Sequence, residues 1–389
     1  MSNAPLDVAD LTRKAQEALS RGEASRAQAL LQGVVASGGA DATVWLTMAH
    51  VALVQKDSEA KTAAIDKALA LAPRDLRALI AKAVDLAMQG DQRAAAAYYS
   101  TVLQLAPSPE SAPPALRDAL RRAEAASGQI VRELEDFVRA RLAESGMSDA
   151  RAPPRFARAV DILFGRKRAY VQQPRYLYYP ELPNVQFYAR DAFPWLDTVE
   201  AAAGAIREEL RSEIGSDFKP YVTQEPGRPR NDQMGMLDNP GWSALFLFKD
   251  GIDQPAAARC GRTMEALSEA PLTRIPKRTP SILFSKLAGG AHIPPHTGML
   301  NTRLICHLPL IVPDGCVFRV GNEERPWIEG KAWAFDDTIE HEAWNRSAQD
   351  RYILIFDIWR PELSVEERAC VSALCEAIDT HRSDVSWDG

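Results

Sequence analysis

The sequence lacks the features that mark membrane proteins, disulfide-stabilised secreted proteins and nucleic-acid-binding proteins. No run approaches the roughly 18 apolar residues that a transmembrane helix needs, so we expect no insertion into a membrane. The N-terminus has no basic segment followed by an apolar core, which a signal peptide would show. The net charge of −6 gives no general attraction to phosphate, so we expect no nucleic-acid partner. The five cysteines include no CxxC pair, and we therefore expect free thiols in a cytoplasmic protein.

The chain does contain enough apolar material for more than one core. Hydrophobic residues make up 46% of its 389 residues and charged residues 25%, a composition typical of globular proteins. A chain of this length is long for one domain and comfortable for two. The aromatic residues are unevenly spread, because seven of the eight tryptophans lie beyond residue 190. We therefore expect two parts with different structures.

The first part contains an internal repeat with a period of 34 residues. The segment LALAP, which ends at Pro73, recurs as LQLAP, which ends at Pro107. The surrounding sequence is rich in alanine and leucine, with apolar positions at helical spacing. A helical hairpin cannot bury its apolar face alone, and small residues let neighbouring hairpins stack closely. The pattern resembles the tetratricopeptide repeat, and Trp45, Ala49, Ala68 and Pro73 fall at its signature positions.

This period sets the expected organisation of the first part. We predict tetratricopeptide-like helical repeats over residues 1–110, with clear repeats at about 43–76 and 77–110 and a degenerate one before them. A generic alanine-rich helical bundle is the alternative. Capping helices and a connector are expected over residues 111–175. Stacked repeats commonly present a concave surface, so we expect this part to dock a partner or orient a substrate.

The second part, residues 176–389, has the pattern of a β-rich domain. Short alternating apolar and polar runs are separated by turns that contain proline, glycine or aspartate, and one helical segment over residues 197–214 precedes them. Many short strands with turns between them predict a sandwich or a closed barrel. The expected strands cover residues 281–287, 303–312, 316–321, 331–337 and 351–359.

Four of the six histidines gather in this β-rich part, at His292, His296, His307 and His341. Imidazole is a common ligand of iron, zinc and copper, so a cluster is a first sign of a metal site. Clustering alone is weak, because a histidine in a β core is more often a hydrogen-bonded structural residue. A loop position is the simpler interpretation of His292.

Strand alternation strengthens the case for a polar site. Within residues 303–312, Arg303 and His307 share one face, while leucines and Cys306 share the other. Within residues 351–359, the same rule turns Arg351 away from the apolar face. Guanidinium groups match carboxylates, so a bound anion would explain these inward cations.

Three ordered blocks of this part resemble a known family. PHTGMLNTRLICHLPLIV, RVGNEERPWIEGKAWAFDDTIEHEAWN and DRYILIFDIWRPEL are similar to the aspartyl/asparaginyl β-hydroxylases, which are iron- and 2-oxoglutarate-dependent oxygenases. The resemblance covers roughly residues 176–365. It implies a double-stranded β-helix, or jelly roll, with flanking helices. Tetratricopeptide-like helices before such a domain also occur in the family.

The resemblance assigns expected roles to individual residues. His296 and His341 match the two histidines that bind iron. Arg351 and Ser285 match the partners of the 2-oxoglutarate carboxylate, and Arg351 is thereby a catalytic residue together with the histidines. His307 matches a histidine near the chelating end of the cosubstrate.

Two further positions of the cosubstrate site are expected with a departure from the family pattern. Trp242 matches a tryptophan that lines the site. Many relatives carry a second arginine where this chain has Ile305. Arg303, two residues earlier on the same face, is the expected substitute.

The family resemblance implies only two protein ligands for iron. In a facial triad, the acidic ligand lies two residues after the first histidine, and Gly298 occupies that position here. Either an exogenous ligand fills the vacancy, or Asp337 or Glu340 reaches the metal from the neighbourhood of His341. We favour the exogenous ligand, because Glu340 adjoins His341 and should point to the opposite face.

The expected function is that of a dioxygenase that uses Fe(II), 2-oxoglutarate and O2. Its substrate would be a C–H bond of an Asp- or Asn-like group in a peptide, a protein or a small molecule. The alternatives are a lipid acyl-chain hydroxylase, an adaptor with repeats and an inactive jelly roll, and a cupin-like zinc or sugar-phosphate enzyme. The adaptor is disfavoured because His296, His341, Ser285 and Arg351 are all present.

Overall fold

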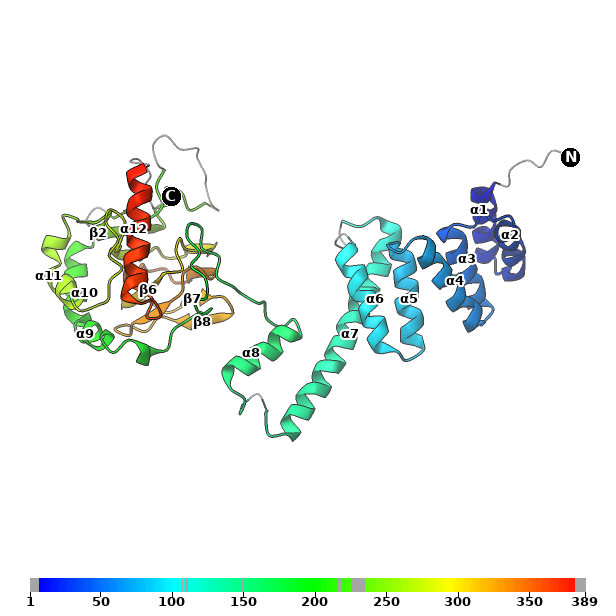
Figure 1. The fold of residues 1–389 in the computed structure, drawn as a ribbon, viewed down its shortest axis with the longest axis horizontal. Coiled ribbons are helices and arrows are strands. Elements are labelled where there is room, and N and C mark those ends of the chain that lie inside the picture. The colour runs from blue at the N-terminus through cyan, green and yellow to red at the C-terminus, as the bar shows by residue number, and fades with distance from the viewer. Residues whose placement is uncertain are drawn as a thin grey trace. The chain divides into compact units, whose positions relative to one another are not determined.

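The chain folds into two compact units, Met1–Arg166 and Lys167–Gly389, which we call unit 1 and unit 2. The structure is a computed structural model that describes residues 7–106, 108, 111–148, 150–215, 218–224 and 235–381 (Figure 1). Within these residues, no helix combines the length and the apolar character that crossing a bilayer requires. Residues 167–175, which the sequence suggested as connector, are part of unit 2.

Unit 1 is built from helices that pack in consecutive pairs. The six helices of the three expected repeats begin close to an acidic residue. Asp41, Asp57, Asp75 and Asp91 each accept a backbone N–H at the start of a helix, which satisfies a donor that has no partner within the helix. The helices are α1 (Val8–Ser20), α2 (Ala24–Ala36), α3 (Ala42–Val54), α4 (Ser58–Leu71), α5 (Leu76–Met88), α6 (Gln92–Leu105), α7 (Pro114–Glu144) and α8 (Pro154–Leu163).

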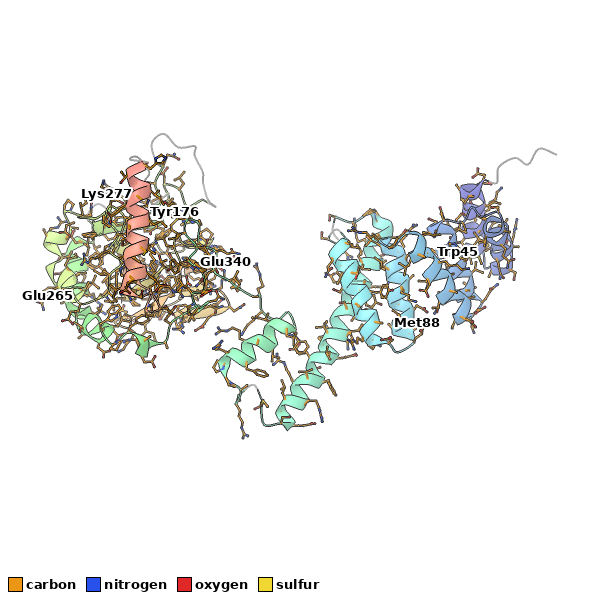
Figure 2. All side chains as sticks on the ribbon, in the orientation of Figure 1. Trp45, Met88, Tyr176, Glu265, Lys277 and Glu340 are labelled. Carbon is orange, nitrogen blue, oxygen red and sulfur yellow. The ribbon has the colours of Figure 1, made fainter. Side chains whose placement is uncertain are left out.

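The helical repeats predicted from the sequence are confirmed, with one hairpin for each repeat. Ala49, Ala68 and Ala83 are buried, which lets neighbouring helices approach closely. Trp45 on α3 is partly buried beside them (Figure 2). Pro107, the end of the second repeat motif, lies outside the described residues.

Unit 2 contains two antiparallel sheets and the helices that flank them. Its helices are η1 (Arg190–Ala192), α9 (Leu196–Ala201), α10 (Ala203–Glu213), η2 (Ala257–Arg259), α11 (Gly261–Ala266) and α12 (Val365–His381). The strands are β1 (Lys219–Pro220), β2 (Trp242–Lys249), β3 (Ile252–Asp253), β4 (Ile282–Leu287), β5 (His292–His296), β6 (Arg303–Ile311), β7 (Cys316–Val320), β8 (Glu323–Pro326), β9 (Trp333–Phe335), β10 (His341–Asn345) and β11 (Arg351–Trp359).

The two sheets form the jelly roll that was predicted. The larger sheet has seven strands in the order β1-β2-β4-β11-β6-β9, with β3 paired to β2, and the smaller has the order β5-β10-β7-β8. The predicted strands 281–287, 303–312, 316–321 and 351–359 correspond to β4, β6, β7 and β11. The predicted strand 331–337 is shorter, and the helix expected over 197–214 is two helices, α9 and α10.

The larger sheet separates two hydrophobic cores. Its outer face packs against α9, α10 and α11, which lie together on one side of the sheets (Figure 1). Leu304 and Cys306 of β6 are buried in this outer core. Ile305, between them, packs instead in the core between the two sheets. The alternation predicted for β6 is therefore correct, and it directs the polar residues of the strand toward the inner core.

Candidate active site

Two histidines from neighbouring strands meet at one end of the smaller sheet. His296 ends β5, and His341 begins β10 directly opposite it in the antiparallel pairing. Their ring centroids are 4.1 Å apart. Burial lowers the pKa of both imidazoles, so both are neutral near pH 7 and able to bind a metal ion.

The backbone fixes which nitrogen of each ring carries the proton. Nδ1 of His296 lies 2.8 Å from the carbonyl oxygen of Pro294, and Nδ1 of His341 lies 3.0 Å from that of Ile339. A carbonyl only accepts hydrogen bonds, so each Nδ1 must donate. Each Nε2 then keeps its lone pair. This is the tautomer and the support that metal-binding histidines require.

A carboxylate occupies the space beside these histidines that a side chain at position 298 would need. A Cβ atom added to Gly298 would lie 2.0 Å from Oδ2 of Asp337, so only glycine fits. The Gly298 N–H also donates to the backbone carbonyl of Asp337, at 2.6 Å. Oδ1 of Asp337 is buried without a hydrogen-bond partner. Burial raises the pKa of this carboxyl to about 7.

Arg351 is a buried cation without an anion. Its side chain is 1% exposed, and both Nε and Nη1 lack hydrogen-bond partners. Its guanidinium lies over the ring of Trp327, with 4.7 Å between the guanidinium carbon and the ring centroid. Burial lowers its pKa to about 9. A buried guanidinium in this state is costly until an anion binds.

Aromatic contacts connect this arginine to the histidine pair. The indole N–H of Trp327 donates to Nδ1 of His307, at 3.4 Å. Phe318 then lies next to both His307 and His341, with ring centroids 5.0 Å and 5.9 Å away. Phe335 contacts the same two histidines. The wall between Arg351 and the histidine pair is therefore apolar.

Ser285 and Trp242 lie on the other side of the histidine pair. The indole N–H of Trp242 donates to Oγ of Ser285, at 3.2 Å, and the Trp242 ring centroid is 6.0 Å from that of His296. Ser285 of β4 pairs with Ile353 of β11, two residues from Arg351. Six of the seven residues that the sequence singled out thus join one cluster: Trp242, Ser285, His296, His307, His341 and Arg351.

The seventh, Arg303, has other partners than the sequence suggested. Its Nη1 lies 3.2 Å from Oδ2 of Asp357, and its Nη2 lies 3.6 Å from Oδ2 of Asp337. Two carboxylates already balance this guanidinium, which leaves little attraction for a cosubstrate anion. Arg303 therefore holds Asp337 in place and does not substitute for an arginine at Ile305.

The other residues considered earlier lie outside the cluster. Glu340 forms an ion pair with Nη2 of Arg319, at 2.9 Å (Figure 2). His292 stacks on Trp344 and lies 3.0 Å from Glu342. Among the residues that the structure describes, no three His, Cys, Asp or Glu side chains form a group that could hold a metal ion.

Sequence reasoning missed a buried ion pair that joins the two histidine-bearing loops. Arg360 and Asp336 are completely buried and lie 3.0 Å apart. Arg360 also donates to the carbonyl of Asn301, which follows the His296 loop, while Asp336 precedes His341. The adjacent charges in the motif FDD were the available signal, but a turn explained them equally well.

The comparisons with known proteins agree with this arrangement. Residues 200–361 match the family model described as aspartyl/asparaginyl beta-hydroxylase. Residues 200–361 belong to this family. The resemblance stated from the sequence is confirmed.

The chain spans only part of the curated relatives that it matches. It is 38% identical over 134 residues to the aspartyl/asparaginyl beta-hydroxylase of Mus musculus, a match that covers 34% of this chain and 18% of that protein. It is 33% identical over 189 residues to the ornithine lipid ester-linked acyl 2-hydroxylase of Rhizobium tropici, covering 48% of this chain and 64% of that protein.

Solved structures resemble each unit at low overall scores. The type III secretion translocator chaperone SycD of Yersinia enterocolitica matches with a TM-score of 0.29 and 13% identity, over 33% of this chain and 86% of that one. A cupin domain of an XRE-family transcriptional regulator from Enterobacter cloacae matches with a TM-score of 0.22 and 12% identity, over 31% of this chain and 98% of that one.

Proposed function

We propose that unit 2 is an Fe(II)- and 2-oxoglutarate-dependent dioxygenase that hydroxylates an unactivated C–H bond. The expected target is the β-carbon of an Asp- or Asn-like group in a peptide, a protein or a small molecule. The observation that carries the proposal is Arg351, a buried guanidinium without an anion in the same cluster as a pair of neutral histidines. Membership of a family whose curated relatives are named hydroxylases supports it.

The residues present fit both groups that this chemistry needs. His296 and His341 each direct Nδ1 to a backbone carbonyl, which leaves Nε2 available for Fe(II). The orphaned Nε and Nη1 of Arg351 suit the distal carboxylate of 2-oxoglutarate, because a guanidinium fork matches a carboxylate. Iron and 2-oxoglutarate, when bound, supply the oxidising power that inserts one oxygen atom of O2 into a C–H bond, with succinate and CO2 as co-products.

The protein's own contribution is binding, orientation and the exclusion of water. Ser285 adds a hydroxyl to the carboxylate site, and Trp242 holds that hydroxyl in place. His307 lies between Arg351 and the histidine pair, where the chelating end of the cosubstrate would be. Phe318 and Phe335 keep this region apolar, which strengthens charge interactions inside it.

A lipid acyl chain is the second candidate substrate. The similarity to the acyl 2-hydroxylase of Rhizobium tropici is the observation that favours it. Both candidates require the same residues in unit 2, so they differ in the substrate alone. An adaptor that only binds remains the alternative from another class.

Succinate formation tests the reaction. Wild-type protein with Fe(II), ascorbate and 2-oxoglutarate should form succinate slowly without a substrate, and His341→Ala should not. Mass spectrometry of proteome and metabolites exposed to each protein should then reveal the substrate by its gain of one oxygen atom. If the wild type forms no more succinate than His341→Ala with any fraction, the adaptor alternative is correct.

We also propose that unit 1 docks the substrate, and this predicts a separable defect. The cut belongs at Arg166, because Leu120 and Ala123 of α7 are buried against α5 and α6. Residues 167–389 should keep the wild-type rate of succinate formation without substrate. The KM for the identified substrate should rise about tenfold, the effect of losing about 1.4 kcal/mol of docking energy. An unchanged KM would restrict unit 1 to a structural or localising role.

A further inference from the structure

A short segment of unit 2 is bound to both loops that carry the paired histidines. The N–H of Gln173 donates to the carbonyl of Thr338, at 2.7 Å, on the loop before His341. The N–H of Arg175 donates to the carbonyl of Gly298, at 2.9 Å, on the loop after His296. We call residues 173–177 the strap.

Side chains and further backbone bonds fix the strap at both ends. Nε2 of Gln172 donates to Oδ2 of the buried Asp336, at 2.7 Å, and its Oε1 accepts from Nδ2 of Asn301, at 2.9 Å. Tyr176, whose N–H donates to the carbonyl of Met299, follows on the strap (Figure 2). The backbone of Arg175 is therefore held between the two histidine loops.

The side chain of Arg175 is exposed, yet its charge acts on the site. Burial is the main cause of the lowered pKa of His296 and of His341, and the positive charge of Arg175 lowers both further. The same charge opposes the effect of burial on the pKa of Asp337. The guanidinium therefore lies within electrostatic reach of all three groups, as its backbone position next to Gly298 requires.

The two other cations near the histidines are committed elsewhere. Arg303 is held by Asp357 and Asp337 on the inner face of the larger sheet. Arg351 is 1% exposed and is separated from the histidine pair by aromatic rings. Arg175 differs from both, because its side chain can reach a group that arrives from solvent.

We propose that Arg175 binds a carboxylate of the primary substrate and so selects substrates that carry an anion close to the carbon that is hydroxylated. The inference rests on the proposed function, which makes the histidine pair the reaction centre. A guanidinium on a fixed backbone recognises a carboxylate by two parallel hydrogen bonds as well as by charge. The carboxylate can belong to a peptide side chain or to an acyl chain.

Binding of matched probes tests this proposal without turnover. Full-length protein with manganese(II) and saturating 2-oxoglutarate is titrated with N-acetyl-aspartic acid amide and with N-acetyl-asparagine amide, which differ by one charge. A second pair, octanoate and octanamide, presents the carboxylate on an acyl chain. Calorimetry should show at least about a tenfold preference for the acid of one pair, and that pair identifies the source of the carboxylate.

Variants then assign the preference to a residue. Arg175→Gln should bring the acid-to-amide ratio close to one, and Arg175→Lys should keep part of it. Arg262→Gln, which removes an exposed arginine on α11, should leave the ratio unchanged. Absence of a preference in both wild-type pairs, or its survival in Arg175→Gln, would overturn the proposal. Succinate formation without probe is measured in parallel, so that failure of the proposed function is recognised separately.

Discussion

Replacing Arg351 with methionine should abolish 2-oxoglutarate binding and at the same time make the ligand-free protein more stable. The guanidinium is buried, two of its nitrogens have no hydrogen-bond partner, and burial lowers its pKa to about 9. Removing the partner of a buried anion should cost roughly 2–5 kcal/mol of binding free energy. Without the anion, a methionine of similar volume relieves the cost of the buried charge.

The stability gain depends on pH in a predictable direction. The pKa of Arg351 is lower in the folded protein than its ordinary value of 12.5, so the charged form destabilises the fold fully below pH 9. This destabilisation fades as the pH rises from 9 toward 12.5, because the neutral form can be buried. The advantage of Arg351→Met should therefore be largest near neutral pH and shrink above pH 9.

Arg360 provides a matched control for this prediction. It is as deeply buried as Arg351, but it donates to Asp336 and to the carbonyls of Asn301 and Pro183. Arg360→Met should therefore destabilise unit 2 by roughly 3–5 kcal/mol, because Asp336 would remain buried without its partner.

Thermal unfolding and calorimetry with 2-oxoglutarate measure both effects. For Arg351→Met, a gain of 1–2 kcal/mol corresponds to a rise in Tm of roughly 2–8 °C for a unit of this size. Near-normal affinity for 2-oxoglutarate in Arg351→Met would refute the assignment of Arg351. A lower Tm of the ligand-free variant would show that the guanidinium has a structural partner after all.

Much of the fold was predictable because its signals are local. The 34-residue period fixes where alanines must be buried, and Ala49 and Ala83 are buried one period apart. The strands β4, β6, β7 and β11 carry strong apolar alternation. By contrast, β5 contains Pro294 and Pro295 and was not predicted. It lies at the edge of the smaller sheet, where a missing N–H is tolerated.

The partners of the site residues were less predictable than the residues themselves. Alternation directed Arg303 and Arg351 to the same face of the larger sheet, but it said nothing of which carboxylates lie nearby. Asp357 reaches Arg303 only because β6 and β11 pair with Trp359 opposite Arg303. Arg175 comes from a segment more than a hundred residues away from the histidines, and no periodicity connects them.

His296→Ala and His341→Ala should each abolish binding of a divalent ion, whereas Asp337→Asn should only weaken it. Both imidazoles direct a free Nε2 away from the carbonyl that holds Nδ1, and their rings face each other. Asp337 is near but already serves other contacts, through Arg303 and through the backbone of Gly298. We therefore expect it to act on the metal as an outer partner, and the exogenous ligand remains our prediction for the third position.

The comparison of carboxylates makes this prediction decisive. Asp337→Asn should reduce affinity for manganese(II) by roughly 10–100-fold, the range for loss of an outer-shell hydrogen-bond partner, and the histidine variants by more. Glu340→Gln should have little effect, because Glu340 is paired with Arg319 and points away from the cluster. Electron paramagnetic resonance of bound and free manganese(II) measures all four variants. A loss in Asp337→Asn as large as in His296→Ala would make Asp337 a direct ligand, since a residue that only supports the site cannot remove as much binding as a ligand does.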